Sequence, residues 1–355
     1  MKISKVALYI EDFNLSRPYE VTYVRHEYVQ NYVLILETDD HVGIGTGCPS
    51  VHVTGEQLSK NPALLEDQIR DILIGKDVRT FYNLITDAAS LFNDSPALLA
   101  TIDIALHDLF SKSIGVHISG YLGTRIKPLP TSITIGIKSL QETLEEGKEY
   151  VDRGFKKIKL KIGTNYELDI ERYLKLRESC PNHVDIRVDA NQGFTTQQLL
   201  AYIDATAISP VEFFEQPLPQ GDYAQMKNLA EDVRRNCAGD EDCQTLNDAL
   251  HLIADPKPYG IFNIKLMKCG GLLEARRISD VAIRTNIDLM WGCMDESCIS
   301  IAAALNMAYA CPNTKYIDLD GSFDLSKDIA SGGFILKDGV MYPDMNHLGI
   351  SAELN

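Results

Sequence analysis

Several features that define other protein classes are missing from this 355-residue chain. No apolar run approaches the roughly 20 residues of a membrane span, and the opening MKISKVALYIEDF lacks the apolar core and cleavage site of a signal peptide. The eight cysteines form no CxxC pair, which argues against a disulfide framework or a zinc site. We therefore expect a cytoplasmic protein with reduced thiols that does not act in a membrane.

Positive charge is also scarce. Lys and Arg total 34 against 50 Asp and Glu, a net charge of −16 that disfavours binding to nucleic acid or to anionic membranes. The histidines form no HxH or HExxH motif, so they indicate no metal site of their own. Apolar content of 45% supports a sizeable core, and the length suits a barrel with a smaller lobe.

The pattern of predicted strands and helices changes near residue 125. Residues 1–125 begin with alternating β-rich stretches and continue with helical ones, the clearest of which starts at the N-cap Ser95 followed by Pro96. This order predicts an α+β capping domain. Residues 126–321 alternate between strand and helix, which predicts an α/β catalytic domain, a (β/α)7β TIM-like barrel. We expect residues 322–355 to pack back on the capping domain.

Five charged residues recur at intervals of about 25 to 28 residues, each at the end of a short apolar run. They are Lys161, Asp189, Glu215, Asp240 and Lys265. This interval matches one strand, one helix and two loops, so successive parallel strands would bring all five to one mouth of the barrel. Three carboxylates in register favour octahedral Mg²⁺ over zinc. Taken singly, each acid is better explained as a solvated loop residue, and it is the register of all three that favours a metal site.

The lysines suggest a reaction. In FKKIKLKIG, strand alternation places Lys157, Lys159 and Lys161 on one face, opposite apolar residues that would pack outward on helices. Inward lysines are costly unless paired or functional; the alternative is a hydrated edge strand. Lys265, four strands on, would face Lys161 across a bound carbon. Two amines beside a metal-bound carboxylate suit 1,1-proton transfer, with the pKa of each lysine lowered towards neutrality by Mg²⁺ and Lys159.

These motifs together resemble the enolase superfamily, in its muconate-lactonising-enzyme-like subgroup, over nearly the whole chain. The motifs are Lys159-x-Lys161, Asp189-x-Asn191, Glu215-Gln-Pro, Asp240-Glu241 and the K-x-x-K-x-G-G from Lys265. The resemblance implies that Lys161 and Lys265 are acid–base residues and that Asp189, Glu215 and Asp240 bind one Mg²⁺ per subunit. It also implies that Lys159 leans towards the substrate carboxylate. Asp242 departs from the subgroup, which usually has Ser there.

The eighth strand suggests which subgroup member this is. Asp318 and Asp320 share a strand face and would attract the α-ammonium group of a peptide, as in dipeptide epimerases; otherwise they are turn-forming acids. By resemblance Thr134 would hydrogen-bond the dipeptide, and Cys293 and Met294 would line the pocket unless they only pack in the core. Asp295 would disfavour an acidic substrate side chain. Arg25 would reach a side chain from the capping loop unless it is a surface residue.

We therefore predict a Mg²⁺-dependent dipeptide epimerase that inverts the C-terminal residue of L-Ala-X dipeptides, with a role in murein peptide metabolism. Alternatives within the subgroup are a muconate cycloisomerase, an o-succinylbenzoate synthase or an N-acylamino acid racemase, none of which needs an ammonium partner. A non-enzymatic scaffold is a further alternative, although a ring of buried charges has no packing use. Barrels of this type often form symmetric homo-oligomers, which we also expect here.

Overall fold

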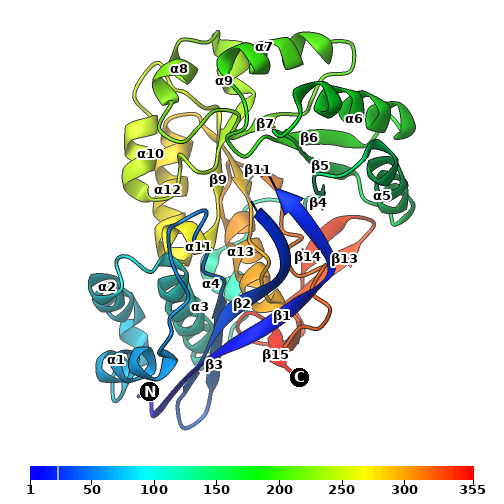
Figure 1. The fold of residues 1–355 in the computed structure, drawn as a ribbon. Helices are drawn as coiled ribbons and strands as arrows, with labels where there is room; N and C mark the ends of the chain where they lie inside the picture. Colours follow the sequence, from blue (N-terminus) through cyan, green and yellow to red (C-terminus); the bar gives the residue numbers. More distant parts are fainter. Residues whose placement is uncertain (22–23) are drawn as a thin grey trace.

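A computed structural model describes the backbone of residues 1–21 and 24–355, and the side chains of these residues except 18–21 and 24–26. Two bodies are visible in Figure 1: an antiparallel sheet with helices, and a ring of strands surrounded by helices. In the part of the chain that is described, no helix is long and apolar enough to cross a membrane.

The N-terminal body is a three-stranded antiparallel sheet packed on helices. Its strands are β1 (Lys5–Val21), β2 (Val24–Glu37) and β3 (Val42–Gly47), and its helices are α1 (Pro62–Leu73), η1 (Val78–Thr80), α2 (Phe81–Leu91), α3 (Pro96–Ser113) and α4 (Ile118–Leu122). Glycines let β3 lie against α3, since a Cβ on Gly45 would come within 2.0 Å of the Thr101 carbonyl oxygen. The predicted helix start at Pro96 is confirmed, but the Ser95 side chain makes no cap hydrogen bond.

The second body is an eight-stranded parallel sheet in sequential order, β4 to β11. Thr131, next to β4, forms a parallel bridge with Ile317 of β11, and this contact closes the ring. The strands are β4 (Ser132–Ile135), β5 (Lys157–Lys161), β6 (Asp185–Asp189), β7 (Phe214–Glu215), β8 (Cys237–Gly239), β9 (Ile261–Ile264), β10 (Asp288–Trp291) and β11 (Thr314–Ile317). The predicted (β/α)7β fold is confirmed.

Helices follow the first seven barrel strands. They are α5 (Leu140–Asp152), α6 (Tyr166–Ser179), α7 (Thr196–Ala205), α8 (Tyr223–Lys227), α9 (Glu231–Arg235), α10 (Leu246–Leu252), α11 (Leu266–Cys269), α12 (Leu272–Arg284) and α13 (Cys298–Ala310). The predicted capping box forms at the start of α5, where Ser139 and Glu142 satisfy each other's backbone N–H groups. Asp240 and Lys265 directly follow β8 and β9, so strand ends do carry these charges.

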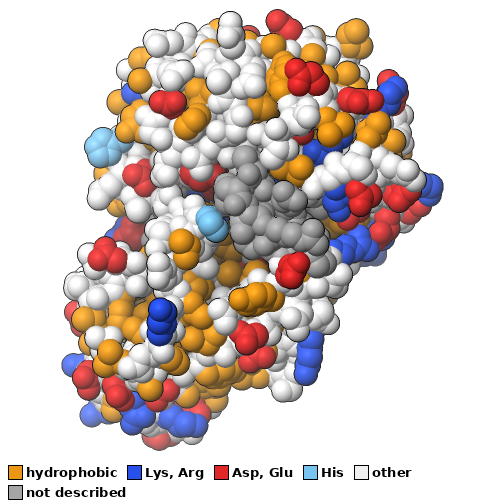
Figure 2. Space-filling view, in the orientation of Figure 1, with side chains coloured by type: hydrophobic (Ala, Val, Ile, Leu, Met, Phe, Trp, Pro, Cys, Tyr) orange, Lys and Arg blue, Asp and Glu red, His pale blue; other side chains and the backbone are white. Residues whose placement is uncertain are grey.

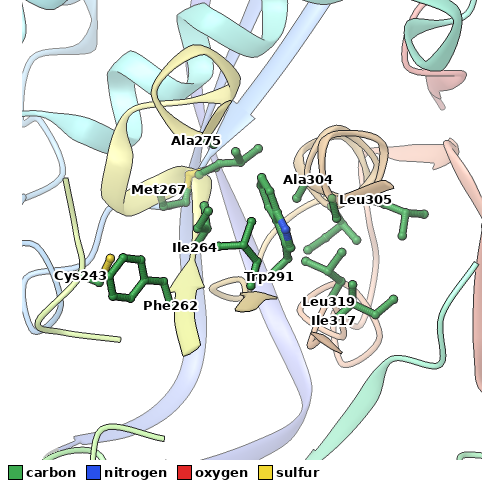
Figure 3. Packing of buried hydrophobic residues seen from close by; sticks show 14 of the residues in the cluster. Cys243, Phe262, Ile264, Met267, Ala275, Trp291, Ala304, Leu305, Ile317 and Leu319 are labelled. Carbon is green, nitrogen blue, oxygen red and sulfur yellow. The ribbon is translucent and has the colours of Figure 1, made fainter. Parts of the chain in front are cut away.

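The core lies between the barrel strands and their helices. In Figure 3, Ile264 of β9 and Trp291 of β10 lie beside Met267 and face the α13 residues Ala304 and Leu305. The Trp291 ring is fully buried, and its indole N–H donates to the Thr314 hydroxyl at 2.9 Å. Such packing holds the strand ends rigid and therefore fixes the side chains that project from them.

The C-terminal segment contacts both bodies. It contains β12 (Ala330–Gly332), β13 (Phe334–Lys337), β14 (Val340–Pro343) and β15 (Ala352–Leu354). Val340 forms a bridge with Pro130 beside the barrel, whereas the backbone N–H of Ile350 donates to Asp108 of α3 at 2.8 Å. These contacts join the C-terminal segment to both the capping domain and the barrel. The domain limits at residues 125 and 321 therefore stay a prediction.

Candidate active site

A cavity of about 380 Å³ opens where the C-terminal ends of the barrel strands meet the N-terminal body. The capping side contributes residues of β1 and β2 and the loop from Cys48 to Val53. The barrel side contributes predicted site residues from several strand ends, namely Thr134, Lys159, Lys161, Asn191, Asp240, Lys265, Cys293, Met294, Asp318 and Asp320. The topology therefore brings most of the predicted site to one place.

The three predicted metal ligands are buried side by side. Asp189 and Glu215 are register partners on β6 and β7, and Asp240 follows the neighbouring β8. Burial and the Asp189 carboxylate raise the pKa of Glu215 to about 8. Burial would also raise the pKa of Asp189, but the amines of Lys161 and Lys159 outweigh it and lower the value to about 2.

The two predicted acid–base lysines flank this row of carboxylates. Lys161 Nζ lies 2.6 Å from Asp189 Oδ2, and Lys265 Nζ lies 2.7 Å from Asp240 Oδ2. Burial acts to lower the pKa of Lys265, yet the ion pair with Asp240 outweighs it and the pKa is raised. In the protein alone, then, the lowered pKa expected from the sequence is not found for Lys265, because an unneutralised carboxylate favours the charged amine.

The donor set suits Mg²⁺. Three buried carboxylates on consecutive strands offer the hard oxygen ligands that this ion prefers. Glu241 Oε2, next to Asp240, is buried and has no hydrogen-bond partner among the described residues. Lys159 Nζ currently lies 3.1 Å from Asp189 Oδ2 and 2.8 Å from Glu215 Oε2. Among the described side chains, no three acidic, His or Cys groups already surround one point.

The aspartate pair after β11 is divided between two environments. Asp318 accepts a hydrogen bond from the Ser132 hydroxyl, and its Oδ2 lies 2.8 Å from Lys159 Nζ. Asp320 accepts the backbone N–H of Thr134 at 2.8 Å. Burial and neighbouring Asp318 raise the pKa of Asp320 to about 7. Both line the cavity, and among the described side chains Asp318 alone of the two forms an ion pair.

The remaining predicted residues are placed as follows. Asn191 accepts from Lys161 Nζ at 2.9 Å and donates to Glu241 Oε1 at 3.4 Å, which links two of the motifs. The Cys293 thiol donates to the Asp318 carbonyl oxygen at 3.2 Å, and Met294 adjoins it on the cavity wall. The side chain of Arg25 lies outside the described residues.

Asp242 stands where the resemblance to the subgroup predicts Ser, and both of its carboxylate oxygens accept hydrogen bonds. Its Oδ2 accepts the Tyr259 hydroxyl at 2.6 Å and the Gln216 side-chain amide at 3.1 Å, and its Oδ1 accepts the Gly221 N–H at 2.7 Å. Gln216 Oε1 in turn accepts the backbone N–H of Asp240 at 2.9 Å. Asp242 thus fixes the loop that carries the third predicted metal ligand.

Sequence reasoning assigned no role to two buried cations. Lys268, one helical turn after Lys265, donates to Asp240 Oδ1 at 2.5 Å and to the Asn263 carbonyl oxygen at 2.8 Å. Arg187 lies inside the barrel and packs against Phe213 and Tyr316, with its Cζ 4.9 and 5.4 Å from their ring centroids. Arg187 precedes Asp189 by two residues on β6, so strand alternation puts it on the same face as Asp189 and would have indicated its inward position.

On the face shown in Figure 2, acidic and basic side chains are interspersed over both bodies. This mixture differs from the basic stripe that typifies nucleic-acid-binding surfaces, and it agrees with the net charge of −16. The charged residues that converge within the cavity are therefore the more informative feature.

Comparison with known proteins identifies relatives of the whole chain. The L-Lys-D/L-Arg epimerases of Desulforapulum autotrophicum and Methylococcus capsulatus are 45% and 44% identical to it, each over 96% of both chains. The hydrophobic dipeptide epimerase of Enterococcus faecalis is 32% identical over 95% of both. A crystal structure of the dipeptide epimerase from Methylococcus capsulatus, complexed with Mg and L-Arg-D-Lys, superposes with a TM-score of 0.96 at 43% identity, covering 99% of each chain.

These relatives confirm the predicted superfamily, the enzyme class (an isomerase of the epimerase type) and the Mg²⁺ cofactor. The model of the family described as "Enolase C-terminal domain-like" matches residues 142–355. The chain therefore belongs to the enolase C-terminal domain-like family, as the ring of strands and the row of carboxylates at its mouth had indicated.

Proposed function

We propose that the protein inverts the α-carbon of the C-terminal residue of a dipeptide by proton transfer between Lys161 and Lys265. The observation that carries this proposal is the mirrored arrangement on five consecutive strands, β5 to β9. Each outer strand supplies a lysine, and each lysine pairs with the carboxylate of the next strand inward. Glu215 lies at the centre of the arrangement.

In this mechanism the two amines act on opposite faces of the substrate carbon. One amine accepts the α-proton and the other donates a proton from the far side, and the reverse reaction exchanges their roles. We assign Asp189, Glu215 and Asp240 as the ligands of Mg²⁺, in the place where Lys159 now contacts the first two. When bound, Mg²⁺ supplies the positive charge that favours loss of the α-proton beside a carboxylate.

The protein itself prepares the site for this chemistry. Asn191 holds the Lys161 amine through its side-chain oxygen, so the amine is aimed before substrate arrives. Lys268 occupies Asp240 Oδ1 and thereby leaves Oδ2 to face Lys265. Residues from Cys48 to Val53 line the cavity from the capping side.

For substrate class, we propose dipeptides with Lys or Arg rather than the L-Ala-X dipeptides expected from the sequence. The relatives at 45% and 44% identity are named for L-Lys-D/L-Arg. Asp295 and Asp320 both line the cavity, and a carboxylate favours a cationic side chain over an apolar or acidic one. A cytoplasmic location and a homo-oligomer remain proposals as well; eight free cysteines, seven of them buried, support a reducing compartment.

The proposal is tested by incubating the protein with Mg²⁺ in D₂O and following α-deuterium incorporation and inversion by NMR and mass spectrometry. The panel contains L-Lys-L-Arg, L-Arg-L-Lys, L-Ala-L-Lys, L-Ala-L-Glu and L-Ala-L-Leu. We expect L-Lys-L-Arg and L-Arg-L-Lys to exchange their α-deuterium at least about 10-fold faster than L-Ala-L-Leu. One charge-assisted hydrogen bond to the substrate is worth about that factor. Equal rates would contradict the substrate class, and no exchange with any dipeptide would contradict the reaction.

A further inference from the structure

The segment that follows Lys265 lies directly against α3 of the N-terminal body. Lys265 comes immediately before α11, and Gly270 and Gly271 connect α11 to α12. Both glycines have a positive φ, of 89° and 117°. A Cβ on Gly270 would come within 2.9 Å of Leu99 Cδ2. A Cβ on Gly271 would overlap the Asp103 side chain. The close approach of α3, together with the backbone conformation, therefore explains why this turn uses glycine.

Asp103 of α3 caps α12 from the other body. The residue before α12 is Gly271, which has no side chain to accept the free N–H groups of the first turn. Asp103 Oδ1 accepts the N–H of Leu272 at 2.8 Å, and its Oδ2 accepts the N–H of Leu273 at 3.2 Å. A negative charge at this end of a helix also interacts favourably with the helix dipole. Asp103 thus supplies the cap that the barrel itself does not.

Two further contacts support this junction. His107 Nδ1 lies 3.1 Å from Asp103 Oδ1, and both side chains are buried. Burial acts to lower the pKa of His107, but the Asp103 carboxylate outweighs it and raises the pKa. The backbone N–H of Cys48 donates to Met267 Sδ of α11 at 3.3 Å. The N-terminal body therefore contacts the segment after Lys265 both in α11 and at the start of α12.

The segment of the other acid–base lysine is supported from within the barrel. Arg172 of α6 donates to the Lys161 carbonyl oxygen at 3.1 Å. Asp169, also on α6, accepts the N–H of Gly163 at 2.8 Å. The two lysines thus have supports from different parts of the chain. A change at the junction of α3 and α12 should therefore displace Lys265 and leave Lys161 in place.

We propose that Asp103 is a positioning residue for Lys265: by capping α12 from the N-terminal body, it holds the segment from Lys265 to Gly271 at the substrate carbon. This inference rests on the proposed dipeptide epimerase function. It gives the N-terminal body a part in the acid–base pair in addition to its part in the cavity wall. Loss of the Asp103 carboxylate should impair proton transfer on the face of the α-carbon that Lys265 serves.

The test compares the two epimers of one substrate, L-Lys-L-Arg and L-Lys-D-Arg, with Mg²⁺ in D₂O. NMR measures the initial rate of α-hydrogen loss from each epimer. Lys161→Met and Lys265→Met identify which epimer each lysine deprotonates, because each variant should lose exchange from one epimer only. In Asp103→Asn, exchange from the Lys265 epimer should fall about 10- to 100-fold relative to exchange from the other epimer.

The ratio of the two rates does not depend on how much of the protein is folded, so lowered stability alone cannot change it. Asp103→Asn keeps one acceptor oxygen for the start of α12, whereas Asp103→Ala keeps none. The shift in the ratio should therefore be larger in Asp103→Ala. A wild-type ratio in Asp103→Asn would overturn the proposal.

The matched control is Asp108→Asn on the same helix. Asp108 is also buried, accepts the N–H groups of Ile44 and Ile350, and forms an ion pair with Lys112 four residues on. It joins α3 to β3 and to the C-terminal segment, so its loss should lower stability and keep the wild-type ratio of the epimers. An equal shift of the ratio in Asp108→Asn and Asp103→Asn would overturn the proposal.

A second readout needs no turnover. Amide hydrogen exchange followed by mass spectrometry should show residues 265–273 exchanging at least about 10-fold faster in Asp103→Asn, with residues 157–163 unchanged. Both segments should keep their wild-type exchange in Asp108→Asn. Unchanged protection of residues 265–273 in Asp103→Asn would overturn the inference. Absent dipeptide exchange in the wild type would instead contradict the proposed function, and the amide protection would still decide whether Asp103 holds this segment.

Discussion

The amine of Lys265, directly after β9, lies 2.7 Å from Oδ2 of Asp240, directly after the neighbouring β8. On the other side of the barrel mouth, the amine of Lys161 likewise lies 2.6 Å from Oδ2 of Asp189. Each lysine is thus presented by a strand end and held by a carboxylate that is also a proposed metal ligand. Acid–base chemistry and metal binding are therefore coupled through the same side chains.

Replacing either lysine should stop inversion. Lys161→Met and Lys265→Met remove one amine each while keeping an unbranched apolar stem, and we expect inversion of the dipeptide to fall by about 10²- to 10⁴-fold. Polarimetry from each epimer measures this. Lys175→Met, at a half-exposed lysine on α6, is the control. A near-normal rate in either site variant would show that the missing amine transfers no proton.

Asp240→Asn should impair both metal binding and stability. It leaves the amines of Lys265 and Lys268 facing a neutral amide, and breaking a buried ion pair costs about 3–5 kcal/mol. Urea unfolding measures the stability, and calorimetric titration measures Mg²⁺ binding. The exposed Asp280 of α12, changed to Asn, should alter neither. Unchanged Mg²⁺ affinity in Asp240→Asn would remove it from the ligand set.

Restoring the subgroup's serine at position 242 should weaken the site. Asp242→Ser leaves the buried Tyr259 hydroxyl and the Gln216 amide short of an acceptor, at a cost of about 1–3 kcal/mol in the free energy of unfolding. Because Gln216 also holds the Asp240 backbone, Mg²⁺ affinity should drop about 10-fold.

The double variant Asp242→Ser/Tyr259→Phe provides the check on this cause. Removing the Tyr259 hydroxyl, which has lost its acceptor in Asp242→Ser, should recover part of the lost stability. The losses in free energy of unfolding of the two single variants should therefore sum to more than the loss of the double variant. Additive losses would mean that the Tyr259 hydrogen bond does not explain the effect.

Glu56 should make stability fall with rising pH. It accepts the N–H groups of Ala97 and Leu98 at the start of α3, and burial raises its pKa to about 7. Between the unfolded value of about 4.3 and this folded value, the folded state holds more proton than the unfolded state, so the free energy of unfolding decreases as pH rises.

The comparison with Glu56→Gln isolates this contribution. The stability difference, wild type minus variant, should decline by up to about 1.4 kcal/mol per pH unit between roughly pH 4.5 and 7. Urea titrations at a series of pH values measure it, with the exposed Glu178→Gln as control. Parallel stability profiles for wild type and Glu56→Gln would refute the assignment.

Much of the fold could be predicted because it is encoded locally. Strand alternation in residues 155–163 correctly placed the lysines inward, and a short apolar run followed by an acid correctly located the ends of β6, β7 and β8. The motifs and their spacing then indicated the enolase superfamily. In contrast, the cap of α3 comes from Glu56, some 40 residues away, and not from Ser95, which the local pattern favoured.

What the sequence determined by itself is which side chains face the barrel mouth, since the period of a strand and the parallel order of the strands decide that. What only the tertiary structure decided is how those charges pair: Asp318 with Lys159, Asp240 with both Lys265 and Lys268, and Asp242 with Tyr259. Pairing depends on distances of a few ångströms between residues far apart in the chain, and neither composition nor periodicity contains those distances.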